Sequence, residues 1–142
     1  MPFSWEQGAG EEVSFDVPDN WTAGRIWPRT ACDFSTNPGP TSCETGGCNG
    51  GLECSKDAGT GVPPATVAEW TLSGDGDADW YDVSLVDGFN IPLAVTPSTD
   101  CQEASCPADL NPDCPAELQQ TGADGSVVGC KSACFANLDG NQ

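Results

Sequence analysis

Three acidic residues near the middle of the chain could carry acid–base chemistry. Glu69 lies in an apolar stretch, residues 66–72, and Asp82 and Asp87 lie in and just after a second one, residues 80–86. The chain contains no histidine, which excludes a Ser-His-Asp triad, a Cys-His pair and an imidazole acid or base. Carboxyl groups alone suffice for glycoside hydrolysis, in which one protonates the leaving oxygen and another activates water or attacks the sugar.

Each acid also has a purely structural interpretation. Glu69 can point to solvent from the polar face of a strand. Asp87 stands before Gly88 in a turn signal, where an aspartate side chain commonly accepts hydrogen bonds from nearby backbone N–H groups. Along one straight strand, residues 82 and 87 would point to opposite faces because side chains alternate. The three carboxyl groups can therefore converge only if Asp87 belongs to a loop.

The net charge restricts the partners. The chain has 22 Asp and Glu residues against 4 Lys and Arg, a formal net charge of −18. This charge repels phosphate backbones and anionic lipid headgroups, so we expect no nucleic acid and no acidic membrane as partner. No run of about 18 apolar residues is present that would span a membrane.

Nine cysteines in 142 residues predict disulfides and an oxidising compartment, hence a secreted protein. Nine is odd, so at least one cysteine lacks a partner within the chain. The first residues have no basic region followed by an apolar one, as a signal peptide would. No apolar element follows the last cysteines. We therefore expect the sequence to be incomplete at both ends.

The elements that would position these residues are short strands. The 17 glycines and 12 prolines punctuate short apolar runs, a rhythm typical of an all-β protein. Pro28 lacks the N–H that a strand ladder needs, so its strand should lie at an edge or end there. Strands are expected over residues 13–17, 24–29, 66–72, 80–86 and 89–96, the last returning after a turn at residues 87–88, and one helical turn over residues 115–119.

Metal and cofactor sites are not predicted. The acidic run at residues 75–79 begins like a calcium loop, but its sixth position is Trp80 and its twelfth is Val86, where an EF-hand has glycine and glutamate. The cysteine spacings do not match paired zinc knuckles. Asn20-Trp21-Thr22 matches the short N-glycosylation pattern, so Asn20 is a weakly supported acceptor.

Several blocks of sequence, in the same order, resemble thaumatin-like proteins, the osmotin and pathogenesis-related family 5 group. The first block reads Gly-Arg-Ile-Trp-Pro-Arg-Thr-Ala-Cys, and the third reads Thr-Val-Ala-Glu-Trp. The resemblance covers roughly residues 11–136. The matching blocks are residues 24–32, 43–52, 66–70, 81–92, 106–110 and 114–118.

The resemblance implies an all-β fold, a thaumatin-like β-sandwich or flattened barrel with disulfide-rich loops, incomplete at both ends here. We expect a sandwich portion with the cleft-forming strands over residues 1–96 and the start of a truncated cysteine-rich domain over residues 97–142. By the same resemblance, the disulfides are Cys32–Cys43, Cys48–Cys54 and Cys114–Cys130. The cysteines Cys101, Cys106 and Cys134 then match family positions whose partners lie beyond the end of this chain.

An acidic cleft is the family's functional feature. By motif position, Arg25 matches its arginine, Glu69 its glutamate, and Asp82 and Asp87 its first two aspartates; the fifth acid lies in a part that this chain lacks. Many members bind β-1,3-glucan and some hydrolyse it weakly. The aromatic residues expected to contact sugars are Tyr81 and Phe89, with Trp70 and Trp80 as further stacking contacts.

Three functions remain open from the sequence. The first is a secreted, monomeric module that binds β-1,3-glucan in defence or wall remodelling. The second is a weak endo-β-1,3-glucanase, with Glu69 as general acid and Asp82 or Asp87 as nucleophile or base. The third is an acidic inhibitor that captures cationic proteins, and its binding would weaken in salt. Whether the protein is an enzyme stays open, and no cofactor is expected.

Overall fold

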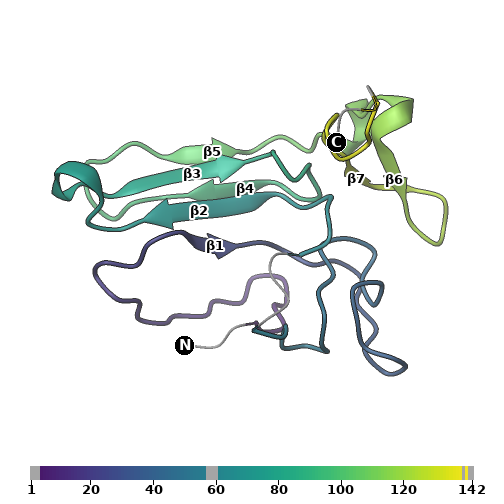
Figure 1. Cartoon of the computed structure of the whole chain (residues 1–142), viewed down its shortest axis with the longest axis horizontal. Helices are drawn as coiled ribbons and strands as arrows, with labels where there is room; N and C mark the ends of the chain where they lie inside the picture. The colour runs from purple at the N-terminus through teal and green to yellow at the C-terminus, as the bar shows by residue number, and fades with distance from the viewer. Residues whose placement is uncertain (1–3, 57–60, 139, 141–142) are drawn as a thin grey trace.

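The computed structural model describes residues 4–56, 61–138 and 140, and within them the regular elements are short strands and single 3-10 turns (Figure 1). Confirming the all-β prediction, the strands are β1 (Gly24–Ile26), β2 (Val67–Thr71), β3 (Trp80–Ser84), β4 (Leu93–Val95), β5 (Ala104–Cys106), β6 (Gln119–Thr121) and β7 (Val127–Cys130). The 3-10 turns are η1 (Asp75–Asp77), η2 (Asn111–Asp113) and η3 (Ala116–Leu118).

The first sheet contains β1, β2 and β3 in that order, with both pairings antiparallel. β1 is an edge strand and ends two residues before Pro28, as expected for a residue that cannot donate to a ladder. Gly24 lies opposite Trp70, and a side chain at Gly24 would collide with the Trp70 indole. Glycine therefore lets the Trp70 ring pack over the edge strand.

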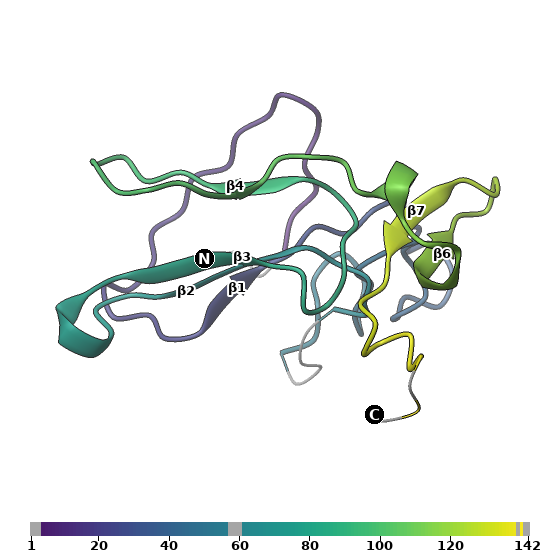
Figure 2. The same cartoon turned by 90° about the horizontal axis from the view of Figure 1, so that it is seen from above.

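The second layer is the two-stranded sheet of β4 and β5, which lies against β2 and β3 (Figure 2). Tyr81 of β3 points toward this layer, because its hydroxyl donates to the carbonyl oxygen of Gln102 just before β5. Since side chains alternate along a strand, Tyr81 and Val83 face the second layer. Asp82, between them, points away from it and is exposed. The first sheet thus has an inner, packed face and an outer face that is buried at Val67, half-buried at Glu69 and exposed at Asp82.

Two strand predictions are wrong. Residues 13–17 form no strand, although Val13, Phe15 and Val17 alternate with polar residues, because no neighbouring strand pairs with them. The strand predicted at residues 89–96 is only β4, and it pairs with β5. It does not return beside β3, because its chain crosses to the second layer after the turn that contains Asp87.

The remaining regular structure is a small hairpin of β6 and β7, which lies beyond one end of the two layers (Figures 1 and 2). The predicted helical turn is present as η3, which begins after Pro115. The expected domain boundary after residue 96 stays a prediction; β5 lies beyond it and yet pairs with β4.

Three disulfides crosslink the loops, and they are the pairs that the family resemblance implies: Cys32–Cys43, Cys48–Cys54 and Cys114–Cys130. All nine cysteines lie in the described residues, and Cys101, Cys106 and Cys134 carry free thiols. Arg29 supports the small Cys48–Cys54 loop by donating to the carbonyl oxygens of Gly51 and Leu52, and burial lowers the pKa of its guanidinium.

The buried side chain of Asn90 joins segments that are far apart in sequence. Its Oδ1 accepts hydrogen bonds from the backbone N–H groups of Thr66 (3.0 Å) and Ile91 (2.9 Å). Its Nδ2 donates to the carbonyl oxygen of Pro28 and to Thr45 Oγ1, both at 2.9 Å. The residue is 2% exposed. Two acceptor and two donor sites are all that an asparagine amide offers, so this side chain is fully satisfied.

The backbone of Asn90 completes this connection. Its N–H donates to Thr66 Oγ1 at 3.2 Å, and its carbonyl oxygen accepts from Asn111 Nδ2 at 3.0 Å. Thr66 Oγ1 in turn donates to the carbonyl oxygen of Ile91. Asn90 therefore fixes the start of β2, the segment after β1 and the η2 region relative to one another.

Replacing Asn90 by alanine should lower the free energy of unfolding by about 2–4 kcal/mol, because several buried donors and acceptors lose their partner at once. Denaturant unfolding of the 142-residue chain measures this change. The matched control is Asn49→Ala, at an exposed asparagine, which should change the stability by less than about 0.5 kcal/mol. Equal effects of the two substitutions would contradict the role given to Asn90.

Candidate functional site

Three of the expected site residues form a row across the outer face of the first sheet. Arg25 of β1 lies opposite Glu69 of β2, and Glu69 lies opposite Asp82 of β3. Directly opposed residues of antiparallel strands point to the same side of the sheet. Neighbouring strands are about 4.8 Å apart, so the row places one guanidinium and two carboxylates within a short span.

Asp87 reaches this row from the loop that follows β3, not from the strand itself. The turn that contains it is closed by the Gly88 N–H, which donates to the carbonyl oxygen of Leu85 at 2.9 Å. The Asp87 carbonyl oxygen accepts from the Ala65 N–H, also at 2.9 Å. Gly88 has a φ of +86°, in the region that favours glycine. The alternation rule that separates residues 82 and 87 along a straight strand therefore does not apply.

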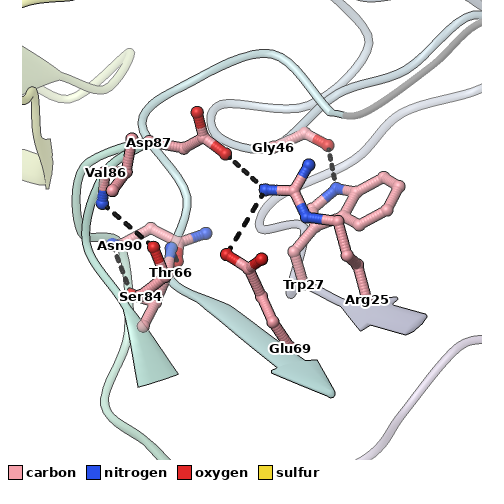
Figure 3. Close-up of polar contacts among 9 residues, drawn as sticks. All are labelled: Arg25, Trp27, Gly46, Thr66, Glu69, Ser84, Val86, Asp87 and Asn90. Atoms are coloured by element: carbon pink, nitrogen blue, oxygen red, sulfur yellow. Dashed lines mark hydrogen bonds and ion pairs between the residues drawn. The ribbon is translucent and has the colours of Figure 1, made fainter. Parts of the chain in front are cut away.

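The guanidinium of Arg25 connects Asp87 to the row (Figure 3). Its Nη2 donates to Asp87 Oδ2 at 2.7 Å and lies 3.9 Å from Glu69 Oε1. These side chains are 27% (Arg25), 37% (Glu69) and 30% (Asp87) exposed. The short contact is a charge-assisted hydrogen bond, so Asp87 is the carboxylate that Arg25 holds most firmly.

We call these four residues, Arg25, Glu69, Asp82 and Asp87, the acid row. One cation stands among three acids, so the row keeps an excess of carboxylate oxygens that can accept hydrogen bonds. Glu69 and Asp82 are not held at hydrogen-bonding distance by Arg25. Their oxygens are therefore available to a ligand that offers hydroxyl groups, or to a reaction that needs a proton donor and a base.

Comparisons with known proteins agree with this architecture. The model of the Thaumatin family matches residues 2–142. The chain belongs to the thaumatin family.

Among its relatives is thaumatin-like protein 1b of Malus domestica, 47% identical over 94% of this chain. Pathogenesis-related protein 5 of Arabidopsis thaliana is 47% identical over 93% of it. A Prunus avium protein named glucan endo-1,3-beta-glucosidase is 46% identical over 92% of it. The thaumatin-family chain spans 63%, 53% and 53% of these relatives' own lengths, respectively.

Two aromatic residues predicted to contact a sugar are placed elsewhere in this thaumatin-family chain. Phe89 is 2% exposed and belongs to the core, with its backbone paired to Cys130. Tyr81 is on the inner face, opposite Trp70, with its hydroxyl bound to Gln102. The prediction for Phe89 is wrong because this side chain is buried, whereas the sugar contact of Tyr81 stays a prediction. Adjacency to Asp82 or Asp87 in sequence does not give a shared face.

Sequence reasoning also missed the supporting residues Asn90, Thr66 and Thr45. All three are polar and buried. The signal that could have found Asn90 is its place between the apolar residues Phe89 and Ile91, where an asparagine must be fully hydrogen-bonded to be buried. Asn90 is three residues after Asp87, so it also fixes the end of the loop that carries this carboxylate.

One cavity borders the acid row at Arg25, and the other features of the thaumatin-family chain do not form a site. The cavity, of about 650 Å³, lies between residues 4–7 and the segment around β1; Arg25 belongs to its lining, and apolar side chains such as Trp5, Phe34 and Leu93 line much of it. Within the part that the structure describes, no cluster of three potential metal ligands exists, and no helix is long and apolar enough to cross a membrane. Asn20 lies in an exposed turn.

The Arg25–Asp87 contact should be measurable as a coupling energy. In a double-mutant cycle with Arg25→Gln and Asp87→Asn, the effects of the two substitutions on the free energy of unfolding should differ from additivity by about 0.5–1.5 kcal/mol. This coupling energy is modest because the pair is partly exposed. The coupling should fall as salt is added. The control cycle pairs Arg25→Gln with Asp82→Asn, because β1 and β3 are about 9.5 Å apart. Coupling in the control cycle as large as in the first would contradict the geometry.

Proposed function

We propose that the outer face of the first sheet binds β-1,3-glucan through the acid row, in a secreted protein of plant-type defence or wall remodelling. The observation that carries the proposal is the convergence of Glu69, Asp82 and Asp87 beside Arg25 on a sheet face that is partly exposed to solvent. Sugar hydroxyls are donors as well as acceptors, and carboxylates are strong acceptors. The Prunus avium relative named glucan endo-1,3-beta-glucosidase supports the choice of glucan.

The arrangement of the acid row favours binding of a neutral sugar. Arg25 restrains the Asp87 side chain, so this carboxylate has little freedom to lose when a ligand is held. The strand register fixes the backbone positions from which Glu69 and Asp82 extend. Three disulfides, and the cysteine content as a whole, support an extracellular location.

Hydrolysis is the second candidate, and one observation favours it. Glu69 and Asp82 are directly paired across β2 and β3, which puts their Cβ atoms about 4.5–5.5 Å apart. Glycosidases hold their two carboxyl groups about 5–9.5 Å apart, a range that side chains extending from these two Cβ atoms can reach. If the protein turns over glucan, Glu69 is the general acid and Asp82 the better placed partner, because Arg25 occupies Asp87.

Binding should depend on the acid row. Soluble β-1,3-glucan is titrated into the 142-residue chain and into Glu69→Gln, Asp82→Asn and Asp87→Asn variants. Each variant should bind about tenfold more weakly, since each loses about 1.4 kcal/mol of charge-assisted hydrogen bonding. The matched control is Glu117→Gln, an exposed acid in η3, which removes the same charge and should leave binding unchanged. A loss common to all four variants would point to net charge and contradict the proposal.

Two further measurements separate the three candidate functions. Release of reducing ends that disappears in Glu69→Gln establishes hydrolysis, and binding without release establishes a binding module.

Raising the salt concentration should leave the binding of neutral glucan nearly unchanged. Capture of cationic proteins would instead weaken strongly. Glucan affinity that collapses in salt would contradict the proposed recognition.

A further inference from the structure

Trp80 is the aromatic residue that the structure places on the same face as the acid row. It lies two residues before Asp82 on β3 and opposite Thr71 on β2. Residues two apart on a strand point to the same side. Of the other aromatics predicted to stack on sugar, Trp70 and Tyr81 lie on the inner face and Phe89 is buried. Of these four aromatic residues, only Trp80 therefore shares the outer face with the acid row.

The indole of Trp80 is exposed but supported from beneath. The side chain is 60% exposed. A methyl group placed at Gly74 would lie 3.0 Å from its Cδ1 atom and 3.4 Å from the Thr71 methyl. The ring therefore lies against the backbone of Gly74 beside Thr71. A methyl group at residue 74 would be in tight contact with the indole and would push the ring away from its present position.

The turn beneath the indole is itself closed by hydrogen bonds. The Gly74 N–H donates to the carbonyl oxygen of Ala78 at 2.8 Å, and the Asp77 N–H donates to the carbonyl oxygen of Gly74 at 3.0 Å. The Ser73 N–H donates to Asp79 Oδ1 at 2.9 Å. A support fixed in this way holds the ring in place before any ligand arrives, which lowers the entropic cost of binding.

Position and chemistry together suit a sugar chain. Successive residues of a strand are about 3.3 Å apart, so Trp80 and Asp82 are separated by roughly 7 Å along β3. A pyranose ring has an apolar face of C–H groups and an edge of hydroxyls. An exposed indole can stack on the apolar face of the sugar, and carboxylates can accept hydrogen bonds from its hydroxyl groups. A single exposed aromatic is ordinary on a protein surface; this one is distinguished by its support and by its neighbours.

We propose that Trp80 is a stacking platform that extends the glucan site along β3, so that longer β-1,3-glucan chains use the acid row and the indole together. This inference rests on the proposed function of the acid row. It predicts how affinity changes with chain length: short oligosaccharides contact the acid row alone, and longer ones gain the contact with Trp80.

The test is a series of β-1,3-linked oligosaccharides of increasing length, titrated into the 142-residue chain and into Trp80→Ala and Trp80→Phe. Trp80→Ala should bind the longer oligosaccharides about three- to tenfold more weakly, as expected for loss of one aromatic contact, and the shortest binding oligosaccharide equally well. Trp80→Phe should recover part of the affinity. Gly74→Ala, which displaces the indole without removing it, should weaken binding of the longer chains in the same direction.

The matched control is Phe135→Ala, at an aromatic residue that is 42% exposed and lies outside the sheets; it should have no effect at any length. Trp80→Ala could bind every oligosaccharide as tightly as the unchanged chain while Asp82→Asn still loses binding. That result would contradict the proposed role of Trp80 and remain consistent with glucan binding by the acid row. Absence of any glucan binding by the unchanged chain would overturn both. Because Trp80 is exposed, Trp80→Ala should unfold at the same denaturant concentration as the unchanged chain.

Discussion

The amide of Asn90 is the interaction on which the arrangement of this chain depends. Every strand in the described residues has only three to five residues, too few to hold a sheet together by its own ladder hydrogen bonds, and the apolar core is small. One buried side chain instead joins the start of β2 (Thr66), the chain after β1 (Pro28) and the loop at Thr45. A buried amide with every donor and acceptor satisfied permits few alternative arrangements, so it holds the start of β2 and the chain after β1 in place next to the ladder register in which the functional residues meet.

The electrostatics of the site follow from that register. The protein carries a formal charge of −18, yet one of its few cations stands among three acids of the outer face. Arg25 binds Asp87 at 2.7 Å and lies 3.9 Å from Glu69, which offsets the repulsion that would otherwise separate the carboxylates. The result is a fixed, hydrogen-bond-accepting surface on the outer face, beside an indole held against Gly74. This combination is suited to sugars and unsuited to anions.

Local patterns in the sequence predicted much of the fold and part of the site. Strands at residues 24–29, 66–72 and 80–86 were expected and appear as β1, β2 and β3 in shortened form, and Pro28 correctly placed β1 at an edge. Because residues 82 and 87 would point to opposite faces of one straight strand, the sequence predicted that Asp87 lies in a loop, as it does. Pairing partners were not predictable in this way: β4 pairs with β5, and residues 13–17 pair with none, because alternation reports a strand's faces and not its neighbours. The same limit explains why the sequence did not reveal that Phe89 is buried and that Tyr81 faces the second layer.

The most direct test of the account is to map where a soluble β-1,3-glucan oligosaccharide contacts the 142-residue chain, by backbone amide chemical-shift changes on titration. If the acid row binds the sugar, the largest changes occur in β2, β3 and the turn at residues 85–88, around Glu69, Asp82 and Asp87. Changes centred instead on the apolar cavity at Trp5, Phe34 and Leu93, with the outer face of the first sheet unaffected, would contradict it.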